Sequence, residues 1–148
     1  MTAGTQAKAG EANSVVEKLW PIGPTTVGRA RHLLTRSLNA WGLEHLAEDA
    51  ELIVSELVTN SVRHAHEPRG HVIQTRFERL HGGVRIEVHD ANVNKPEPRS
   101  ASTEDESGRG LILVELITGG RWGVSDRIGI GKMVWAVCAD GGVDGTPT

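Results

Sequence analysis

Glu56 and Asn60 are the pair of residues in this 148-residue chain whose types and spacing best suit chemistry. They stand one helical turn apart in residues 50–65, where apolar residues recur at helical spacing and predict an amphipathic helix packed on a core. A carboxylate and a carboxamide at positions i and i+4 project side by side, and the border of the apolar face keeps both partly desolvated. The alternative is that they form only the polar shoulder of a surface helix.

Three features further along the chain favour a nucleotide site. Asp90 ends a segment with strand alternation, where its side chain can leave the sheet and meet a ligand. Residues 91–107 show neither the helical nor the strand pattern of apolar residues. So long an irregular loop in a small domain predicts an active-site lid, with a solvated insertion as the alternative. Gly108 and Gly110 flank Arg109 at the opening of an apolar helix, where free amides and close backbone approach suit a phosphate, although a simple tight turn has the same pattern.

The spacing of apolar residues changes along the chain, and these changes predict the helices and strands that must position the site residues. The predicted segments are a strand at residues 15–20, a helix from Thr25 or Thr26 to Gly42, a helix from about Leu46 to His66, a hairpin about Gly82-Gly83, a helix from Gly108 to Gly119-Gly120, and a last hairpin at 122–125 and 132–138. This order predicts an α+β fold, a two-layer α/β sandwich with helices on one face of a mainly antiparallel mixed sheet. We expect one domain at residues 14–139, with disordered tails at 1–13 and 140–148.

The composition of the chain limits the classes of function that it can have. Hydrophobic residues make up 38% and charged residues 24%, as in ordinary globular domains. The net charge of -3, without a basic block, argues against nucleic acid as a partner. No apolar run predicts a membrane span or a signal peptide, and the single Cys138 excludes an internal disulfide, so we expect a cytoplasmic protein in which Cys138 fills space in a strand.

The residues Glu56-Leu57-Val58-Thr59-Asn60, Asp90 and Gly108-Arg109-Gly110-Leu111 occur in an order that resembles the GHKL ATPase superfamily (Bergerat fold). Within it, the chain looks like the small bacterial proteins related to anti-sigma factor serine/threonine kinases, over roughly residues 15–138. The Glu-x-x-x-Asn helix is the more specific part of the match. The resemblance implies a histidine kinase-like ATPase (HATPase) domain, with ATP and Mg²⁺ as cofactors.

The resemblance also implies roles for individual residues. Asn60 would hold the Mg²⁺ that bridges the nucleotide phosphates, and Glu56 would be the general base that takes the proton of the attacking hydroxyl. Mg²⁺ prefers hard oxygen ligands and keeps several waters, so one amide oxygen and the phosphates suffice. Phosphoryl transfer then depends mainly on positioning and charge neutralisation. Asp90 matches the residue that reads the exocyclic amine of adenine.

The remaining implied contacts concern the phosphates. Gly108, Gly110 and Leu111 match the lid end that closes on them. Arg63 and Arg109 are candidate phosphate contacts by charge and placement, with surface salt bridges as the alternative.

The chain departs from the family pattern in three places. Asn92 and Asn94 stand where the family has glycines after the adenine-reading Asp, and Met133 stands where many relatives have a nucleotide-binding Thr. Asn tolerates left-handed backbone, so these changes bear on affinity more than on fold. No phospho-accepting His helix precedes the domain, so a complete sensor histidine kinase is not expected.

Two functions from different classes follow. The first is an ATP- and Mg²⁺-dependent serine/threonine protein kinase that phosphorylates an anti-sigma-antagonist-like protein and also binds a sigma factor. The alternative is a non-catalytic binding module with weak nucleotide affinity that acts by stoichiometric contact; slow ATP hydrolysis is a third option. Relatives suggest a homodimer through the side of the sheet. A metal site at His64, His66 and His71 is disfavoured, because His64 and His66 point to different sides of a helix and His64 is expected to pack or cap near its end.

Overall fold

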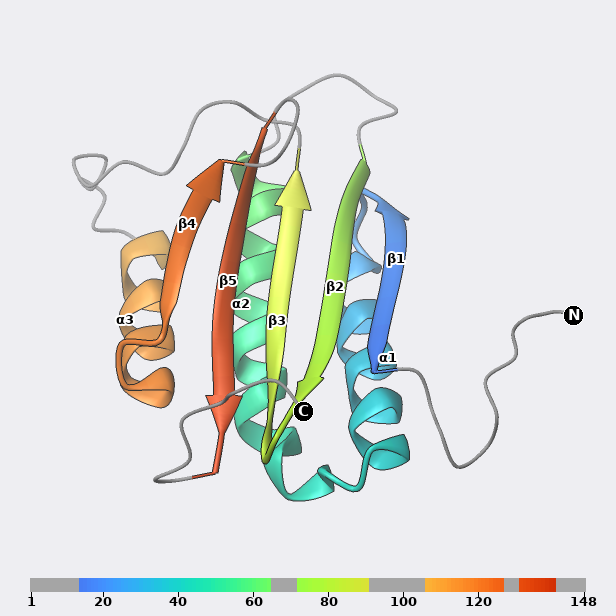
Figure 1. The fold of residues 1–148 in the computed structure, drawn as a ribbon. Helices are drawn as coiled ribbons and strands as arrows, with labels where there is room; N and C mark the ends of the chain where they lie inside the picture. The colour runs from blue at the N-terminus through green and yellow to red at the C-terminus, as the bar shows by residue number, and fades with distance from the viewer. Residues whose placement is uncertain (1–13, 65–71, 91–105, 127–130, 141–148) are drawn as a thin grey trace, which may run out of the picture.

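The fold has two layers, a sheet and a set of helices behind it (Figure 1). The computed structural model describes residues 14–64, 72–90, 106–126 and 131–140, without the side chains of 63, 64, 106–110 and 126. The predicted tails therefore lie outside the described residues, apart from Asp140. The amide of Asp140 donates to the carbonyl of Gly82 at 3.0 Å, and its carboxylate lies 2.6 Å from His45 Nε2.

The described strands form one five-stranded sheet in which every pairing is antiparallel. Their spatial order is β1 (Val15–Pro21), β2 (Val72–Leu80), β3 (Gly83–Asp90), β5 (Lys132–Ala139) and β4 (Trp122–Asp126). The predicted α+β architecture with a mainly antiparallel sheet is confirmed, and the described strands contain no parallel pair. β1 and β4 are the two edges.

The helices lie on one face of the sheet, with α2 behind its middle and with α1 and α3 on either side of α2 (Figure 1). They are α1 (Thr26–Ala40), the short 3₁₀ helix η3 (Glu44–Leu46), α2 (Ala47–His64) and α3 (Glu106–Thr118). The positive φ of 72° at Gly42 follows the end of α1, as predicted. None of the described helices is long and apolar enough to cross a membrane.

The start of α3 differs from the prediction. The helix begins at Glu106, so Gly108 and Gly110 lie inside its first turns instead of ahead of it. An acidic residue is favourable in the first turn because it faces the positive end of the helix dipole.

The core lies between α2 and the central strands. Its side chains that are at most 1% exposed include Ile53, Val54 and Leu57 of α2 and Phe77, Ile86 and Val88 of the sheet. Burial of this size stabilises by roughly 1.5–3 kcal/mol for each side chain. It also fixes the rotation of α2 about its axis, and so the direction in which Glu56 and Asn60 point.

Cys138 belongs to this core and is 3% exposed. Burial raises the pKa of its thiol to about 12, so the thiolate is not formed near neutral pH. The prediction that Cys138 fills space in the last strand is confirmed.

The sheet face opposite the helices carries a charged network instead of an apolar core. Glu87 is its centre, 7% exposed, with Arg85 Nε at 2.7 Å, His89 Nε2 at 2.8 Å and Arg76 Nη1 at 3.5 Å. Burial alone would raise the pKa of Glu87, but the bonds from His89 and Arg85 and the charges of the two arginines lower it to about 2. The Arg85 guanidinium also lies 4.7 Å from the ring centre of Trp135.

Candidate active site

Helix α2 directs Glu56 and Asn60 toward α3. The α1 side of α2 is marked by Glu51, whose Oε2 accepts a hydrogen bond of 2.8 Å from Thr35 of α1. At about 100° per residue, Asn60 lies roughly 180° and Glu56 roughly 140° around the axis from Glu51. α3 packs on that opposite side of α2 (Figure 1). Both side chains are half-buried, so the carboxylate and carboxamide lie at the border of the α2–α3 contact.

Asp90 lies on the helix-facing side of the sheet and is 2% exposed. Its Oδ2 accepts a hydrogen bond of 3.0 Å from the hydroxyl of Ser61, the residue after Asn60. The ammonium of Lys132 lies 3.4 Å from the same oxygen and is itself 4% exposed. These contacts join α2, β3 and β5 at one point. They place the buried carboxylate next to the end of α2 that carries Asn60.

Ser61 and Lys132 are absent from the residues singled out in the sequence. The strand register would have revealed Lys132, because it is the cross-strand partner of Asp90 in the β3–β5 pair. Met133 is the partner of His89 and therefore lies on the sheet face away from the helices. Lys132, not Met133, is the residue of β5 that lies next to Asp90.

The backbone of α3 shows where the two glycines at its start lie. Gly108 falls in the first turn of α3, where N–H groups lack intrahelical acceptors and can meet an anion. Leu111, one turn further, is half-buried.

The structure does not describe the side chains of the other residues predicted for the site. Asn92, Asn94 and most of the predicted lid lie outside the described residues, as do the side chains of Arg63 and Arg109. His66 and His71 and the side chain of His64 are also outside them.

The donor set fits Mg²⁺ with a nucleotide. Asn60 carries an amide oxygen on the half-buried side of α2, a hard donor of the kind that Mg²⁺ prefers, and Glu56 lies one turn away on the same side. Few protein oxygens are needed, because phosphates and water fill the remaining positions.

An antiparallel sheet backed by helices, with an acid and an amide one turn apart on the central helix, defines a domain of the nucleotide-binding ATPase class. The chain belongs to the family described as histidine kinase-like ATPase domain, whose profile matches residues 21–119. Membership of this family implies ATP binding. No curated protein matches the chain.

A solved structure supports the same fold. The chain is similar to the histidine kinase domain from the Erythrobacter litoralis EL346 blue-light activated histidine kinase, with a TM-score of 0.52 and 25% sequence identity. The match covers 88% of this chain and 66% of the solved one, so the present chain spans slightly less than two thirds of that domain.

Proposed function

We propose that this chain is an ATP- and Mg²⁺-dependent protein kinase of the anti-sigma factor type. It transfers the γ-phosphoryl group of ATP to a serine or threonine of a small anti-sigma-antagonist-like protein, and a sigma factor is its second partner. The observation that carries the proposal is the half-buried pair Glu56 and Asn60, directed toward α3 beside the buried Asp90.

Each residue has a distinct task in this proposal. Asn60 holds Mg²⁺ through its amide oxygen, and the bound ion neutralises charge on the phosphates. Glu56 accepts the proton of the attacking hydroxyl, since its carboxylate is one turn away on the same side of α2. Asp90 accepts a hydrogen bond from the exocyclic amine of adenine. The free amides in the first turn of α3, including that of Gly108, bind phosphate oxygens.

The non-catalytic module remains the second candidate, and one observation favours it. Asp90 already accepts a hydrogen bond from Ser61 and forms an ion pair with Lys132, so the carboxylate assigned to adenine has partners within the protein. In such a protein the fold is retained, nucleotide affinity is low, and regulation depends on contact with the partner.

Calorimetry with Mg-ATP and a phosphotransfer assay on the co-purified partner test the proposal. Asn60→Ala removes the Mg²⁺ ligand, so we expect loss of Mg-ATP binding. Glu56→Gln keeps the shape of the side chain but not the base, so we expect ATP binding to persist while transfer falls by about 10²–10⁴-fold. Glu48→Gln is the matched control, because Glu48 is exposed in the first turn of the same helix.

Three results would count against the kinase assignment. If wild-type protein gives no binding heat at millimolar Mg-ATP, the module is favoured. If Glu56→Gln transfers phosphate at the wild-type rate, Glu56 is not the base. If Asn60→Ala binds Mg-ATP normally, the metal assignment fails.

A further inference from the structure

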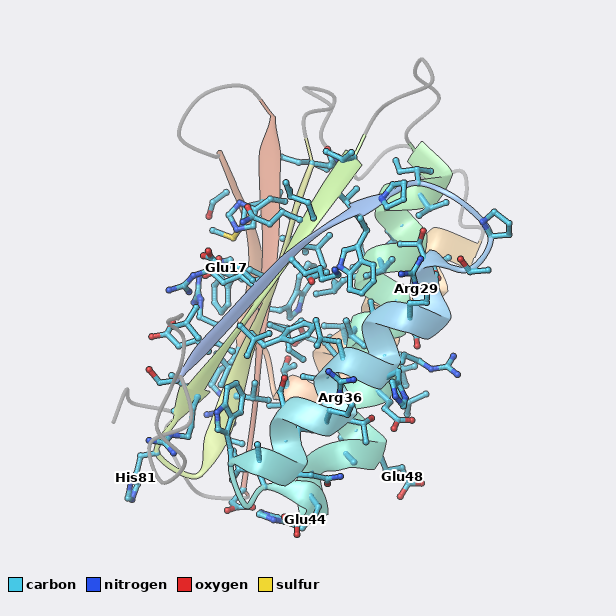
Figure 2. The ribbon with its side chains drawn as sticks, turned by 90° about the vertical axis from the view of Figure 1, so that its right-hand side faces the viewer. Glu17, Arg29, Arg36, Glu44, Glu48 and His81 are labelled. Carbon is cyan, nitrogen blue, oxygen red and sulfur yellow. The ribbon has the colours of Figure 1, made fainter. Side chains whose placement is uncertain are left out.

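A cavity lies at the edge of the molecule away from α3, between β1 and α1 (Figure 1). Its volume is about 380 Å³, and its lining comes from Lys18, Trp20, Gly28, Arg29, His32, Leu33 and Arg36. We call it the β1–α1 pocket. Figure 2 looks onto this edge, with Arg29 and Arg36 projecting from α1 beside the strand. The pocket is separate from the α2–α3 site, because α1 and α3 flank α2 on opposite sides (Figure 1).

The lining of the β1–α1 pocket is cationic. α1 carries Arg29, Arg31, His32 and Arg36 and no acidic residue, in a chain whose net charge is -3. Within the described part of the chain, no carboxylate forms an ion pair with Lys18, Arg29 or Arg36. Side chains of one sign held close together without counter-charges attract an anionic ligand.

The floor of the pocket is the apolar ring of Trp20, whose orientation is fixed by a hydrogen bond. Trp20 is 3% exposed, and its indole N–H donates a hydrogen bond of 2.9 Å to the hydroxyl of Thr75. Lys18 Nζ lies 5.3 Å and Arg29 Cζ 5.5 Å from the centre of the Trp20 ring, within the range of cation–π attraction. The ring therefore supports the two cations at the rim. Such a pocket suits a ligand with both apolar and anionic groups.

The strand beside the pocket adds a second requirement on the ligand. Among the strands that the structure describes, β1 is an edge of the sheet and pairs with β2 alone. Side chains alternate along a strand, so Lys18 and Trp20 share the helix-facing side, while Glu17 lies on the other face and bonds to Arg76 at 3.1 Å. A strand added along the outer edge of β1 would place every second side chain over the pocket.

We propose that the β1 edge and the β1–α1 pocket bind an extended acidic segment of a partner protein by strand addition. Alternate Asp or Glu side chains of the segment face the pocket and pair with Lys18, Arg29 and Arg36, while the residues between them face the other side of the sheet. Within the described residues, the outer edge of β1 has no strand partner, and its backbone N–H and C=O groups have the spacing of a polypeptide strand. A free phosphate, a lipid headgroup or a nucleic acid cannot match that spacing. This inference does not depend on the nucleotide chemistry.

Fluorescence anisotropy with a labelled peptide of alternating Glu and Val is the first test. We expect binding that weakens as salt is raised, since exposed charge pairs are screened. Arg36→Glu reverses a charge at the pocket and should weaken binding about tenfold. Arg31→Glu is the matched control, because Arg31 is exposed on the same helix but does not line the β1–α1 pocket. It lines a neighbouring hollow that shares only Gly28 and His32 with that pocket, so its effect should be much smaller.

Two further peptides test the mode of binding. A peptide of the same composition with Glu and Val in blocks should bind weakly, because strand addition presents only alternate residues to the pocket. A Lys and Val peptide should not bind. In the NMR spectrum, the indole N–H signal of Trp20 should shift with the alternating peptide in wild-type protein and not in Arg36→Glu.

The outcomes separate this proposal from the kinase proposal. Asn60→Ala should bind the alternating peptide normally, and Arg36→Glu should bind Mg-ATP normally. Equal losses in Arg36→Glu and Arg31→Glu would overturn the pocket assignment. Equal binding of the block and alternating peptides would overturn strand addition. A self-associated dimer that buries β1 and excludes the peptide would show that the edge serves a second copy of the chain.

Discussion

At the scale of single residues, the ion pair of Asp90 and Lys132 is the feature that most affects the proposed nucleotide site. Both side chains are almost fully buried, and their charged atoms lie 3.4 Å apart. A buried pair contributes little net stability compared with apolar residues, but one partner left without the other is costly. Lys132 therefore compensates the charge of Asp90 in the folded protein.

This argument predicts the effect of Lys132→Met on stability. The substitution leaves the Asp90 carboxylate buried without this ammonium, and we expect the free energy of unfolding to fall by about 3–5 kcal/mol. Asp90→Asn combined with Lys132→Met removes both charges and should recover most of that loss. Urea denaturation of wild type, the two single variants and the double variant measures the coupling. If the losses of the two single variants add up to the loss of the double variant, the pair is not coupled.

At the scale of elements, sequence periodicity was sufficient for the order and type of helices and strands. The helix with Glu56 and Asn60 and the hairpin that ends at Asp90 lie where their apolar patterns placed them, because each pattern is local. The pairing of β3 with β5 is not local, since α3 and β4 lie between them in sequence. A register one residue different would exchange Lys132 and Met133 between the two faces, so local patterns could not identify Lys132 as the neighbour of Asp90.

The turn between β2 and β3 also differs in detail from its prediction. Gly82 lies in the turn with a φ of 71°, whereas Gly83 is already the first residue of β3 and pairs with Leu80. A Cβ on Gly83 would lie 2.7 Å from the carbonyl oxygen of Cys138. The second glycine of the pair is therefore needed for close approach to β5.

This contact predicts that Gly83→Ala is destabilising. The obstructing atom belongs to the backbone of β5 and cannot move without disturbing the strand pair, so we expect a loss of about 1–3 kcal/mol in the free energy of unfolding. Gly28→Ala is the control, because nothing lies within 4 Å of a Cβ there and the site is in a helix, where alanine is favoured over glycine. Thermal denaturation of both variants measures the difference. A Gly83→Ala protein as stable as wild type would contradict the close approach.

At the scale of the whole molecule, the two faces of the sheet are stabilised by different forces. Apart from the Asp90–Lys132 pair at one end, the helix-facing side is held by apolar burial, which depends little on pH. The opposite side depends on Glu87 and the side chains bonded to or paired with it, Arg76, Arg85 and His89. The pH dependence of stability should therefore report on the charged face more than on the core.

The direction of that pH dependence follows from the pKa of Glu87. Its pKa is about 2 in the folded protein against an ordinary 4.5, so ionised Glu87 stabilises the fold above pH 4.5, and this contribution is lost as pH falls from there toward 2. Glu87→Gln should lower stability at pH 7 by on the order of 1–3 kcal/mol, with discount for the partly exposed arginines. It should also reduce the fall in the free energy of unfolding between pH 4.5 and 2. Urea denaturation across this pH range, with Glu48→Gln as the exposed control, measures both effects. If Glu87→Gln keeps the wild-type fall over this range, other carboxylates determine the acid sensitivity of the fold.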